Sequence, residues 1–541
     1  MMDYLKRNRI PILIASVQWF ITTILQIDRL FFSYDGESKY LLATKALYFC
    51  FLVIIWCFGF DAYKKIKSGD GNYIRGFYIF RVYFAVVVVL MLVLWPGTWA
   101  WDDLWTLFYI AGYGEWRPWQ HILTGAYQDV LLQILPFPGG IILLQNIIIS
   151  ICVAFGVTKL ETIFGIGRWK NKFADAVVKI LPFLLPPVLM YQFSGYRIGL
   201  YVYLEFVMLV MLMGAIKDKE EWSKAYLSLF CILCIIVSTW RTESLFYIPC
   251  ACILLWFINK KVIPNPRKIF CILMIVIGFF GIDKAQKQAL GNANYEIVSL
   301  MPPCVELVRN ADSLEDAEQL ADIDKVVDLE MVRNNPSQSG EALYWVPDVV
   351  RTGYTDKDYR GFLKAIVKLS FKYPKVVFRE RWNVFIKGTG ISELGVYATN
   401  VRGTAALFDE TNESRAVVLT QDKGWIANSP VFKNIRKCFI YLLGMEKMDG
   451  SGSGVWKRLI WNAFIPLVIL VYGWFKLLIK RKWYLWGICT AVLIRVPVVI
   501  LTAPTSMIMY FLSFYFLGYV CLVYMLLTGW SNRNRGRERK K

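Results

Sequence analysis

Histidine is almost absent from this chain of 541 residues, because His121 is the only one. A zinc site built from several histidines is therefore excluded. Charged side chains are also scarce, at 19% of the residues, whereas soluble proteins carry about 25%. Hydrophobic residues make up 57% of the chain. This composition excludes a soluble enzyme, a disordered chain and a collagen-like fibre, and it predicts an all-α polytopic membrane protein.

Acidic residues are too few to balance the basic ones. The chain has 61 Lys and Arg against 41 Asp and Glu, which gives a net charge of +20. The basic residues lie in short segments between apolar runs, as the positive-inside rule predicts for cytoplasmic loops. A nucleic-acid-binding protein would gather them on one soluble domain, so we expect no nucleic-acid partner. The basic tail at 533–541 is interpreted as a topology anchor at the anionic inner leaflet.

A disulfide scaffold is missing too. Of the twelve cysteines, only Cys304 and Cys438 lie in a polar region, and the others lie in apolar runs where Cys acts as a small hydrophobe. These two could form a disulfide in an oxidising compartment or remain free thiols. Their spacing in the sequence does not decide between the two states.

Apolar runs recur along most of the chain. A membrane-spanning helix needs about 17–25 mainly apolar residues. We predict about twelve spans, near residues 10–27, 41–60, 77–96, 137–158, 174–191, 199–216, 225–240, 245–259, 268–284, 459–479, 484–503 and 508–528. Twelve spans return the chain to its starting side, so parity and charge bias together predict a multi-pass protein of the cell membrane with both termini in the cytoplasm.

The predicted spans fall into two groups. Nine lie in a transmembrane region at 1–284, which includes a first outer loop at 98–136, and three lie in 456–541 ahead of the basic tail. Residues 285–455 contain no apolar run long enough to span a membrane, and we expect a mixed or mainly helical extracytoplasmic domain there. Within it, 431–443 alternates basic and apolar residues, which is typical of a helix on the membrane surface.

The first outer loop opens with Trp101, Asp102 and Asp103, shortly after Pro96-Gly97. At the rim of a cavity, either carboxylate could accept a proton from an acceptor hydroxyl or bind a divalent cation such as Mg²⁺ or Mn²⁺. Two acids at a helix start are also common as caps. We predict that Asp102 and Asp103 are catalytic and, if a cation is used, its ligands.

Further candidates follow in the same loop. His121 shares it with Arg117, Glu115 and several tryptophans. A lone histidine is usually a satisfied surface or core residue, but this density of polar and aromatic groups makes a binding role equally plausible. We predict that His121, Arg117 and Trp101 contact a substrate.

Two arginines lie at the outer ends of apolar spans. Arg197 lies in the turn 192–198, and Arg241 lies in a turn after the seventh span. Arginine near a membrane is costly unless it finds a partner, and its planar fork binds phosphate through two parallel hydrogen bonds. We predict phosphate recognition by both. The alternative for Arg241 is a structural ion pair with Glu243.

The order of these features resembles the GT-C integral-membrane glycosyltransferases. The closest likeness is to a poorly characterised bacterial branch with a W-D-S-x-x-Q-like first loop followed by N-H-H-P-V-L, a span-edge F-R-N-N-G and a K-Y-P in its outer domain. Residues 101–103 (W-D-D), 119–123 (W-Q-H-I-L), 240–244 (W-R-T-E-S) and 371–374 (F-K-Y-P) stand at those places. The chain departs from the branch in having one histidine where the branch has two, no proline after it, and T-E-S in place of N-N-G.

The resemblance implies a sugar transferase that uses a polyprenyl-phosphate sugar as donor and a glycan or lipid as acceptor on the outer face of the membrane. For the family it implies an outer-loop Asp as base or metal ligand, carried here to Asp102 and Asp103. It also implies a basic residue for the donor phosphate, carried to Arg241, with His121 as a donor or acceptor contact. The expected role is modification of a cell-envelope polysaccharide or glycolipid.

Two other functions remain open. A transporter or lipid flippase would carry ionisable residues inside its spans, and Arg495 is the deepest of the candidates, which also include Lys45, Arg81 and Lys179. The third possibility is a non-catalytic assembly protein of a cell-envelope polymer pathway. The large insertion and the carboxylates of the first loop favour an enzyme, since conduction needs neither.

Overall fold

The computed structural model describes residues 8–24, 40–99, 103, 106–107, 109–110, 114–291, 295–391, 432–442 and 459–538. All regular secondary structure in these segments is helical, and one isolated antiparallel bridge joins Val327 to Val350. The all-α prediction is confirmed for this part of the chain.

Seven described helices are long and apolar enough to cross a membrane. They are α3 (Leu41–Lys67), α4 (Gly71–Leu94), α7 (Pro138–Phe164), α10 (Arg197–Gly214), α13 (Asn265–Leu290), α25 (Trp483–Thr502) and α26 (Leu512–Glu538). Four shorter apolar helices are α2 (Arg9–Ile24), α11 (Lys224–Thr239), α12 (Tyr247–Trp256) and α24 (Phe464–Ile479). Every predicted span thus coincides with helical structure. A multi-pass membrane protein is supported, while the count of twelve stays a prediction.

The fifth predicted span, 174–191, is not one straight helix. It consists of α8 (Lys172–Ile180), η3 (Leu181–Leu184) and α9 (Pro186–Gln192), with a bend of 74° between the two parts. Prolines cause this break, because they lack the N–H that continues a helix and their rings clash with the preceding turn. If the bent pair counts as one span, the candidate spans number eight.

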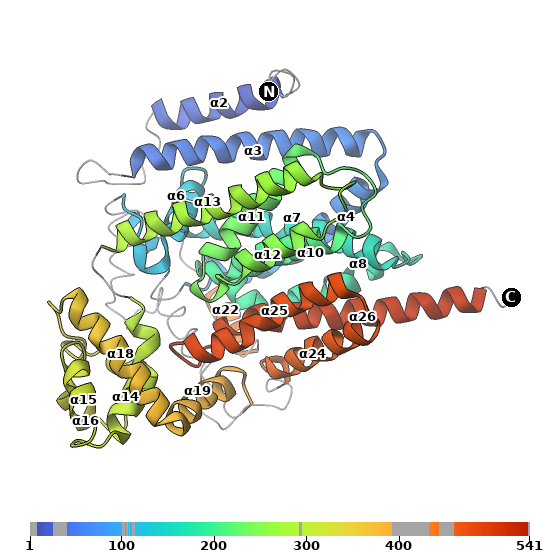
Figure 1. Ribbon diagram of the computed structural model, residues 1–541. Coiled ribbons are helices and arrows are strands. Elements are labelled where there is room, and N and C mark those ends of the chain that lie inside the picture. Colours follow the sequence, from blue (N-terminus) through green and yellow to red (C-terminus); the bar gives the residue numbers. More distant parts are fainter. Residues whose placement is uncertain are drawn as a thin grey trace.

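The apolar helices lie roughly alongside one another in one bundle (Figure 1). Helix α10 runs through its middle and packs on α7, α11 and α26. The Phe206 ring of α10 packs directly on the α7 backbone at Gly156, where an added Cβ would lie 2.1 Å from the ring. A side chain at residue 156 would therefore displace the Phe206 ring from its packed position.

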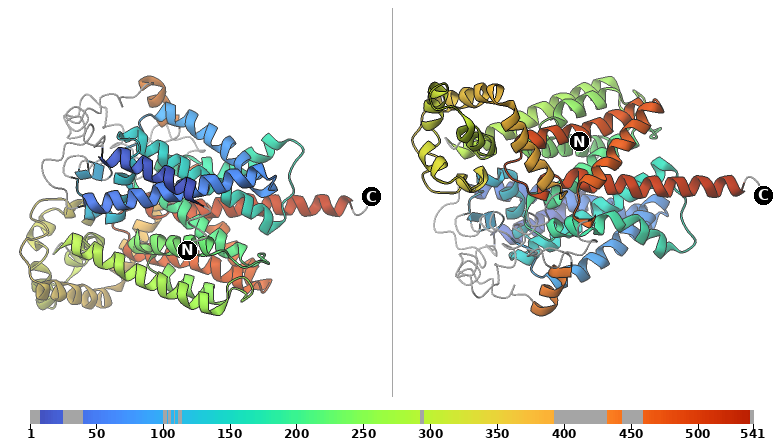
Figure 2. Two further views of the ribbon diagram at one scale, coloured as in Figure 1. Left: turned by 90° about the horizontal axis from the view of Figure 1, so that it is seen from above. Right: turned by 90° about the horizontal axis from the view of Figure 1, so that it is seen from below.

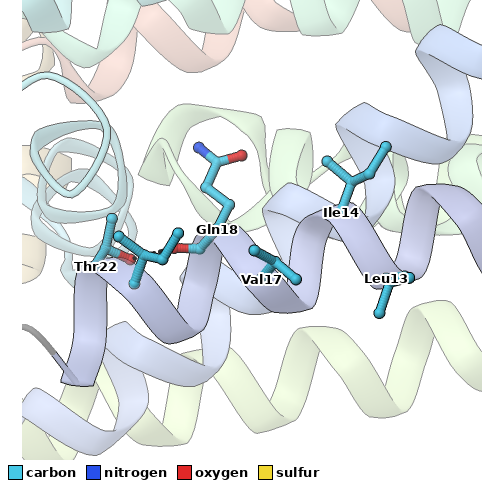
Figure 3. A pocket seen from close by; sticks show the side chains of 6 residues that line it. Leu13, Ile14, Val17, Gln18 and Thr22 are labelled. Atoms are coloured by element: carbon cyan, nitrogen blue, oxygen red, sulfur yellow. Dashed lines mark hydrogen bonds between the residues drawn. The ribbon is translucent and has the colours of Figure 1, made fainter.

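Helices α2 and α3 form an outer layer of the bundle (Figure 1). Ala15, Tyr48 and Leu52 make a small core of their own between the two helices. A shallow apolar groove on α2 is lined by Leu13 and Val17, among others (Figure 3). Apolar side chains on the outside of a membrane bundle face the lipid tails, so we assign this groove to lipid contact.

A second group of helices has a separate core. It contains α14 (Ile297–Asn310), α15 (Ala317–Asp324), α16 (Leu329–Asn334), α17 (Gly340–Tyr344) and α18 (Asp356–Lys372). Helix α19 (Pro374–Gly388) joins this group to the bundle, because its Phe385 is buried in the bundle core. Figures 1 and 2 show the group at the end of the bundle opposite to the C-terminal end of α26. The predicted boundary at 285 falls inside α13, which continues to Leu290.

Two short helices outside the apolar spans pack on the bundle. Helix α6 (Ile122–Leu132), which follows η2 (Pro118–Gln120), packs on α3 and α7. Helix α22 (Lys433–Leu442) places Arg436 against the end of α4, where its guanidinium donates to the carbonyls of Leu94, Trp95 and Gly97. The Gly97 N–H also donates to the Leu94 carbonyl at 2.8 Å, so Arg436 and this backbone group together cap the end of α4. The placement of α22 on a membrane surface stays a prediction.

Candidate functional site

Three turns that are far apart in the sequence meet at the end of the bundle nearest the second helical group. Arg197 Nη1 donates to the carbonyl of Gln120 at 3.0 Å and to that of Trp240 at 2.9 Å. The Trp240 indole N–H donates to Thr124 Oγ1 at 2.9 Å, and Thr124 Oγ1 donates to the Gln120 carbonyl at 2.5 Å. Arg197 thus ties the segment that contains η2 and the start of α6 to the turns before α10 and after α11.

Asp103 lies beneath the turn that carries Arg197. Its Oδ2 accepts a hydrogen bond from the Gly195 backbone N–H at 2.9 Å, and the residue is 2% exposed. The turn needs glycine here, since an added Cβ would lie 2.5 Å from the Trp99 ring and 2.9 Å from Asp103 Cβ. Gln128 Nε2 donates to the Gly195 carbonyl from the other side at 2.9 Å. Asp103 therefore helps to fix the position of Arg197.

A polar cavity of about 80 Å³ opens between the converging turns and the second helical group. Arg197, Arg241 and Glu243 line it from the bundle, and Val298 and Ser299 line it from α14. The remaining lining residues are Gln120, Tyr196, Thr242, Tyr295, Thr502, Pro504, Met509 and Tyr510. One water needs roughly 10–15 Å³ of such space. The cavity therefore has room for several waters or a phosphate-sized group, but not for a sugar in addition.

Arg241 and Glu243 form an ion pair in the cavity wall, in which Arg241 Nε donates to Glu243 Oε1. They are 3% and 6% exposed. The Arg241 guanidinium also lies 5.4 Å from the centre of the Tyr510 ring, at a distance suited to a cation–π contact. The pairing with Glu243 expected as the structural alternative is therefore present. It occupies Nε, one of several donors of the planar group.

The cavity carries a net positive charge. Burial alone would raise the pKa of the Glu243 carboxyl, but the neighbouring arginines, Arg241 above all, lower it below its usual value. Glu243 is therefore ionised. It contributes one negative charge to the cavity wall, whereas Arg197 and Arg241 contribute two positive charges. Among the described residues, the hydrogen-bond partners of Arg197 are the backbone carbonyls of Gln120 and Trp240. Arg197 also begins α10, and a helix N-terminus adds partial positive charge. One negative charge on a ligand would balance the site.

His121 lies beside the cavity without lining it. Its φ of 71° is rare for a residue with a side chain, and its Nδ1 accepts a hydrogen bond from the Leu123 N–H at 3.3 Å. Burial, with a smaller contribution from the charge of Arg197, lowers the pKa of His121 to about 3. The imidazole is therefore neutral at physiological pH, with its proton on Nε2, and it can offer a ligand a hydrogen bond but no charge.

The remaining predicted site residues are Trp101, Asp102 and Arg117, none of which is among the described residues of the cavity wall. Trp101 and Asp102 lie outside the described residues, so their roles stay predictions. Arg117 immediately precedes η2 and is not among the residues that line the cavity. In the part of the chain that the structure describes, no group of three or more His, Cys, Asp or Glu side chains could hold a metal ion. The requirement for a divalent cation remains untested.

The residues that favoured a transporter have polar or aromatic partners. Lys179 Nζ lies 2.8 Å from carboxylate oxygens of both Glu161 and Asp175. Lys45 Nζ donates to the Gln133 side chain at 2.6 Å, and Arg81 lies 5.0 Å from the centre of the Phe77 ring. Arg495 is fully buried and lies near the cavity, as described below.

Sequence analysis missed several parts of this site. Tyr295 and Tyr510 line the cavity, and the Thr124 hydroxyl connects Trp240 to Gln120 beside it. Nothing in the motifs marks these residues, because tyrosine and threonine are ordinary at the ends of apolar helices. Glu243 was considered only as a structural partner of Arg241.

No family model, curated protein or solved structure matches this chain. The resemblance to the GT-C glycosyltransferases therefore rests on the short motifs alone and stays a prediction.

Proposed function

We propose that this protein is a membrane glycosyltransferase that moves a sugar from a polyprenyl-phosphate donor to a glycan or lipid acceptor on the outer face of the membrane. One observation carries the proposal. A cavity with a net positive charge, lined by Arg197 and Arg241, lies where the ends of apolar helices meet a separate helical group. A lipid-linked phosphate needs such a place, because its tail stays in the bilayer while its head reaches polar groups.

The charge of the cavity suits this donor. A polyprenyl-phosphate sugar is a phosphodiester with one negative charge, which balances the excess positive charge of Arg197 and Arg241. In the transfer, the acceptor oxygen bonds to the anomeric carbon, the bond from that carbon to the phosphate oxygen breaks, and the acceptor proton passes to a base. The leaving phosphate gains negative charge, and fixed guanidinium groups stabilise that charge as it develops.

Asp102 is the candidate base. Its neighbour Asp103 is already hydrogen-bonded to Gly195 N–H and acts in this proposal by positioning Arg197. His121, being neutral, would donate a hydrogen bond from Nε2 to donor or acceptor. A divalent cation at Asp102 stays part of the proposal, although no step above depends on it.

The second helical group would select the acceptor. The cavity of about 80 Å³ is closed on one side by Val298 and Ser299 of α14. Since it cannot hold a sugar beside a phosphate, the proposal requires α14 and the bundle to separate before the donor binds. Closure afterwards would exclude water, which protects the donor from hydrolysis.

The test uses the full-length protein in phospholipid nanodiscs. Binding of polyprenyl monophosphate is compared with binding of polyprenol, which has the same tail without the phosphate. Release of polyprenyl phosphate from polyprenyl-phosphate sugars is then assayed. Arg197→Ala and Arg241→Ala should each strongly weaken phosphate-dependent binding and leave a measurable remainder, whereas Arg168→Ala should retain it in full, because Arg168 does not line the cavity and is 53% exposed. Equal binding of the two lipids would refute the proposal.

A flippase or transporter remains the second candidate. It is favoured by the ion pair of Arg495 and Glu205, which is buried among the helices of the bundle. Proteoliposomes separate the two functions. A flippase moves a labelled lipid-linked sugar across the bilayer without breaking the bond to its phosphate, whereas a transferase breaks that bond on the side where it binds.

A further inference from the structure

A buried ion pair lies next to the candidate site and takes no part in it directly. Arg495 of α25 and Glu205 of α10 are 1% and 0% exposed, and Arg495 Nη2 lies 3.0 Å from Glu205 Oε1. The Tyr247 hydroxyl of α12 donates to the same carboxylate oxygen at 2.5 Å. Arg495 Nη1 donates to Ser513 of α26. The pair therefore connects four helices of the bundle.

The same arginine reaches the turn that carries Arg241. Arg495 Nη2 donates to the Tyr201 hydroxyl at 2.6 Å and to Ser244 Oγ at 2.9 Å. The Tyr201 hydroxyl donates in turn to Ser244 Oγ at 2.7 Å. Ser244 is the last residue of η4 (Thr242–Ser244) and the residue after Glu243. A short hydrogen-bonded path thus leads from the ion pair to the wall of the cavity.

The turn has little support of its own. Within it, the Ser244 N–H donates to the Arg241 carbonyl at 3.0 Å, and the Leu245 N–H reaches the Thr242 carbonyl only at 3.4 Å. One end is held by Arg197, which donates to the Trp240 carbonyl. The Ser244 hydroxyl holds the other end by accepting from Arg495 and Tyr201, so loss of the Arg495 contact would weaken that end of the turn.

The ion pair is not arranged for maximum stability. Within the described residues, Arg495 Nε and Glu205 Oε2 are buried without a hydrogen-bond partner. Unmade hydrogen bonds of this kind reduce the benefit of a buried pair, and neutral side chains of similar size often replace such a pair at little cost in stability. Fold stability alone therefore does not account for two charges at this place.

We propose that Arg495 and Glu205 are a positioning pair, which holds the Arg241–Ser244 turn so that Arg241 faces the cavity. The inference rests on the proposed function for its consequence, since the positioned group is the one that would bind the donor phosphate. Arg495 acts through Ser244 and Arg241 and touches no substrate.

The test combines a measurement that needs no ligand with one that does. Hydrogen–deuterium exchange of the backbone amides of residues 243–246 is compared in wild type, Ser244→Ala and the double variant Arg495→Gln/Glu205→Gln. Loss of a buried hydrogen bond should speed their exchange by about tenfold. Ser150→Ala is the matched control, because Ser150 is equally buried in α7 and its hydroxyl donates to the Asn146 carbonyl at 2.7 Å. It should leave these amides unchanged.

Binding of polyprenyl monophosphate in nanodiscs provides the second measurement. Ser244→Ala should weaken it by about tenfold in the wild-type background and should have no further effect when Arg241 is already Ala, because the two changes act through one group. An effect of Ser244→Ala that is undiminished in the Arg241→Ala background would refute positioning through Arg241.

Unchanged exchange at 243–246 in both the Ser244→Ala and the double variant would also overturn the proposal. The proposed function can fail separately. Suppose that exchange at 243–246 is faster in the variants but that the wild-type protein binds polyprenol and polyprenyl phosphate with equal affinity. The positioning pair would then be supported, and the proposal that the cavity binds a phosphate would be refuted.

Discussion

The pair of Arg241 and Glu243 allows the phosphate-binding role to be separated from a purely structural one. Glu243→Gln leaves a guanidinium group buried at 3% exposure without its carboxylate. Breaking a buried pair by removal of one partner typically costs about 3–5 kcal/mol in the free energy of unfolding. Arg241→Gln/Glu243→Gln removes both charges, so we expect it to recover most of that loss.

Donor binding should follow a different order among the same variants. Arg241→Lys keeps the charge but loses the planar fork. Hydrogen bonds to a charged group contribute about 1.5–3 kcal/mol, so we expect the affinity for polyprenyl monophosphate to fall by roughly 10- to 150-fold. The double variant should be stable and yet bind no better than Arg241→Ala.

The assay measures thermal unfolding and polyprenyl monophosphate binding on each purified variant in nanodiscs. Arg309 and Glu306 provide a control pair, since they lie 2.9 Å apart on α14 with Glu306 39% exposed. Glu306→Gln should cost no more than about 1 kcal/mol, as is usual for a surface pair. If Arg241→Ala binds the phosphate lipid as wild type does, while the double variant recovers stability, Arg241 has a structural role only and the reasoning fails.

Three further predictions concern the outer loop and the topology. Asp102→Asn should lower turnover by about 10²–10⁴-fold, as expected for loss of a general base, whereas Asp103→Asn should cost less because the amide oxygen can still accept from the Gly195 N–H; inactive Asp103→Asn beside fully active Asp102→Asn would reverse these assignments. The pKa of His121 is about 3 in the folded protein, against about 6.5 in an unfolded chain. The unfolded state therefore binds the proton first as the pH falls. This residue's contribution to stability is complete above about pH 6.5 and falls by about 1.4 kcal/mol per pH unit from there down to about pH 3. His121→Gln should remove this component from the variant, so the difference between the wild-type and variant unfolding-versus-pH curves should show it; superimposable pH dependence would contradict the assigned burial. Finally, Cys substitutions for Glu315 and Lys541 should be labelled by an impermeant thiol reagent in intact cells at 315 and not at 541, and the opposite pattern would invert the predicted topology.

Local properties of the sequence were sufficient for much of the fold. Length and hydropathy of an apolar run decide whether it forms a buried helix, so the twelve predicted spans all coincide with helical segments. The break in the fifth span shows the limit of this reasoning. An average over apolar residues indicates burial, but the proline positions decide where the helix bends. The arginines at helix ends were also recognisable, because charge next to an apolar run is conspicuous in a sequence.

Only the tertiary structure decided how these residues combine. Asp103 meets Gly195, Arg197 reaches Gln120 and Trp240, and Arg495 reaches Ser244 across 251 positions of the chain. Such contacts depend on which helices are neighbours and on how far each helix is shifted along its axis relative to the next. Both are set by the fit of many side chains at once. A short motif records the kind of a residue and its neighbours in sequence, whereas the sign of the charge in the cavity arises from groups on separate helices. The sequence therefore determined the helices and the arginines at their ends, and packing determined that two of these arginines share one cavity.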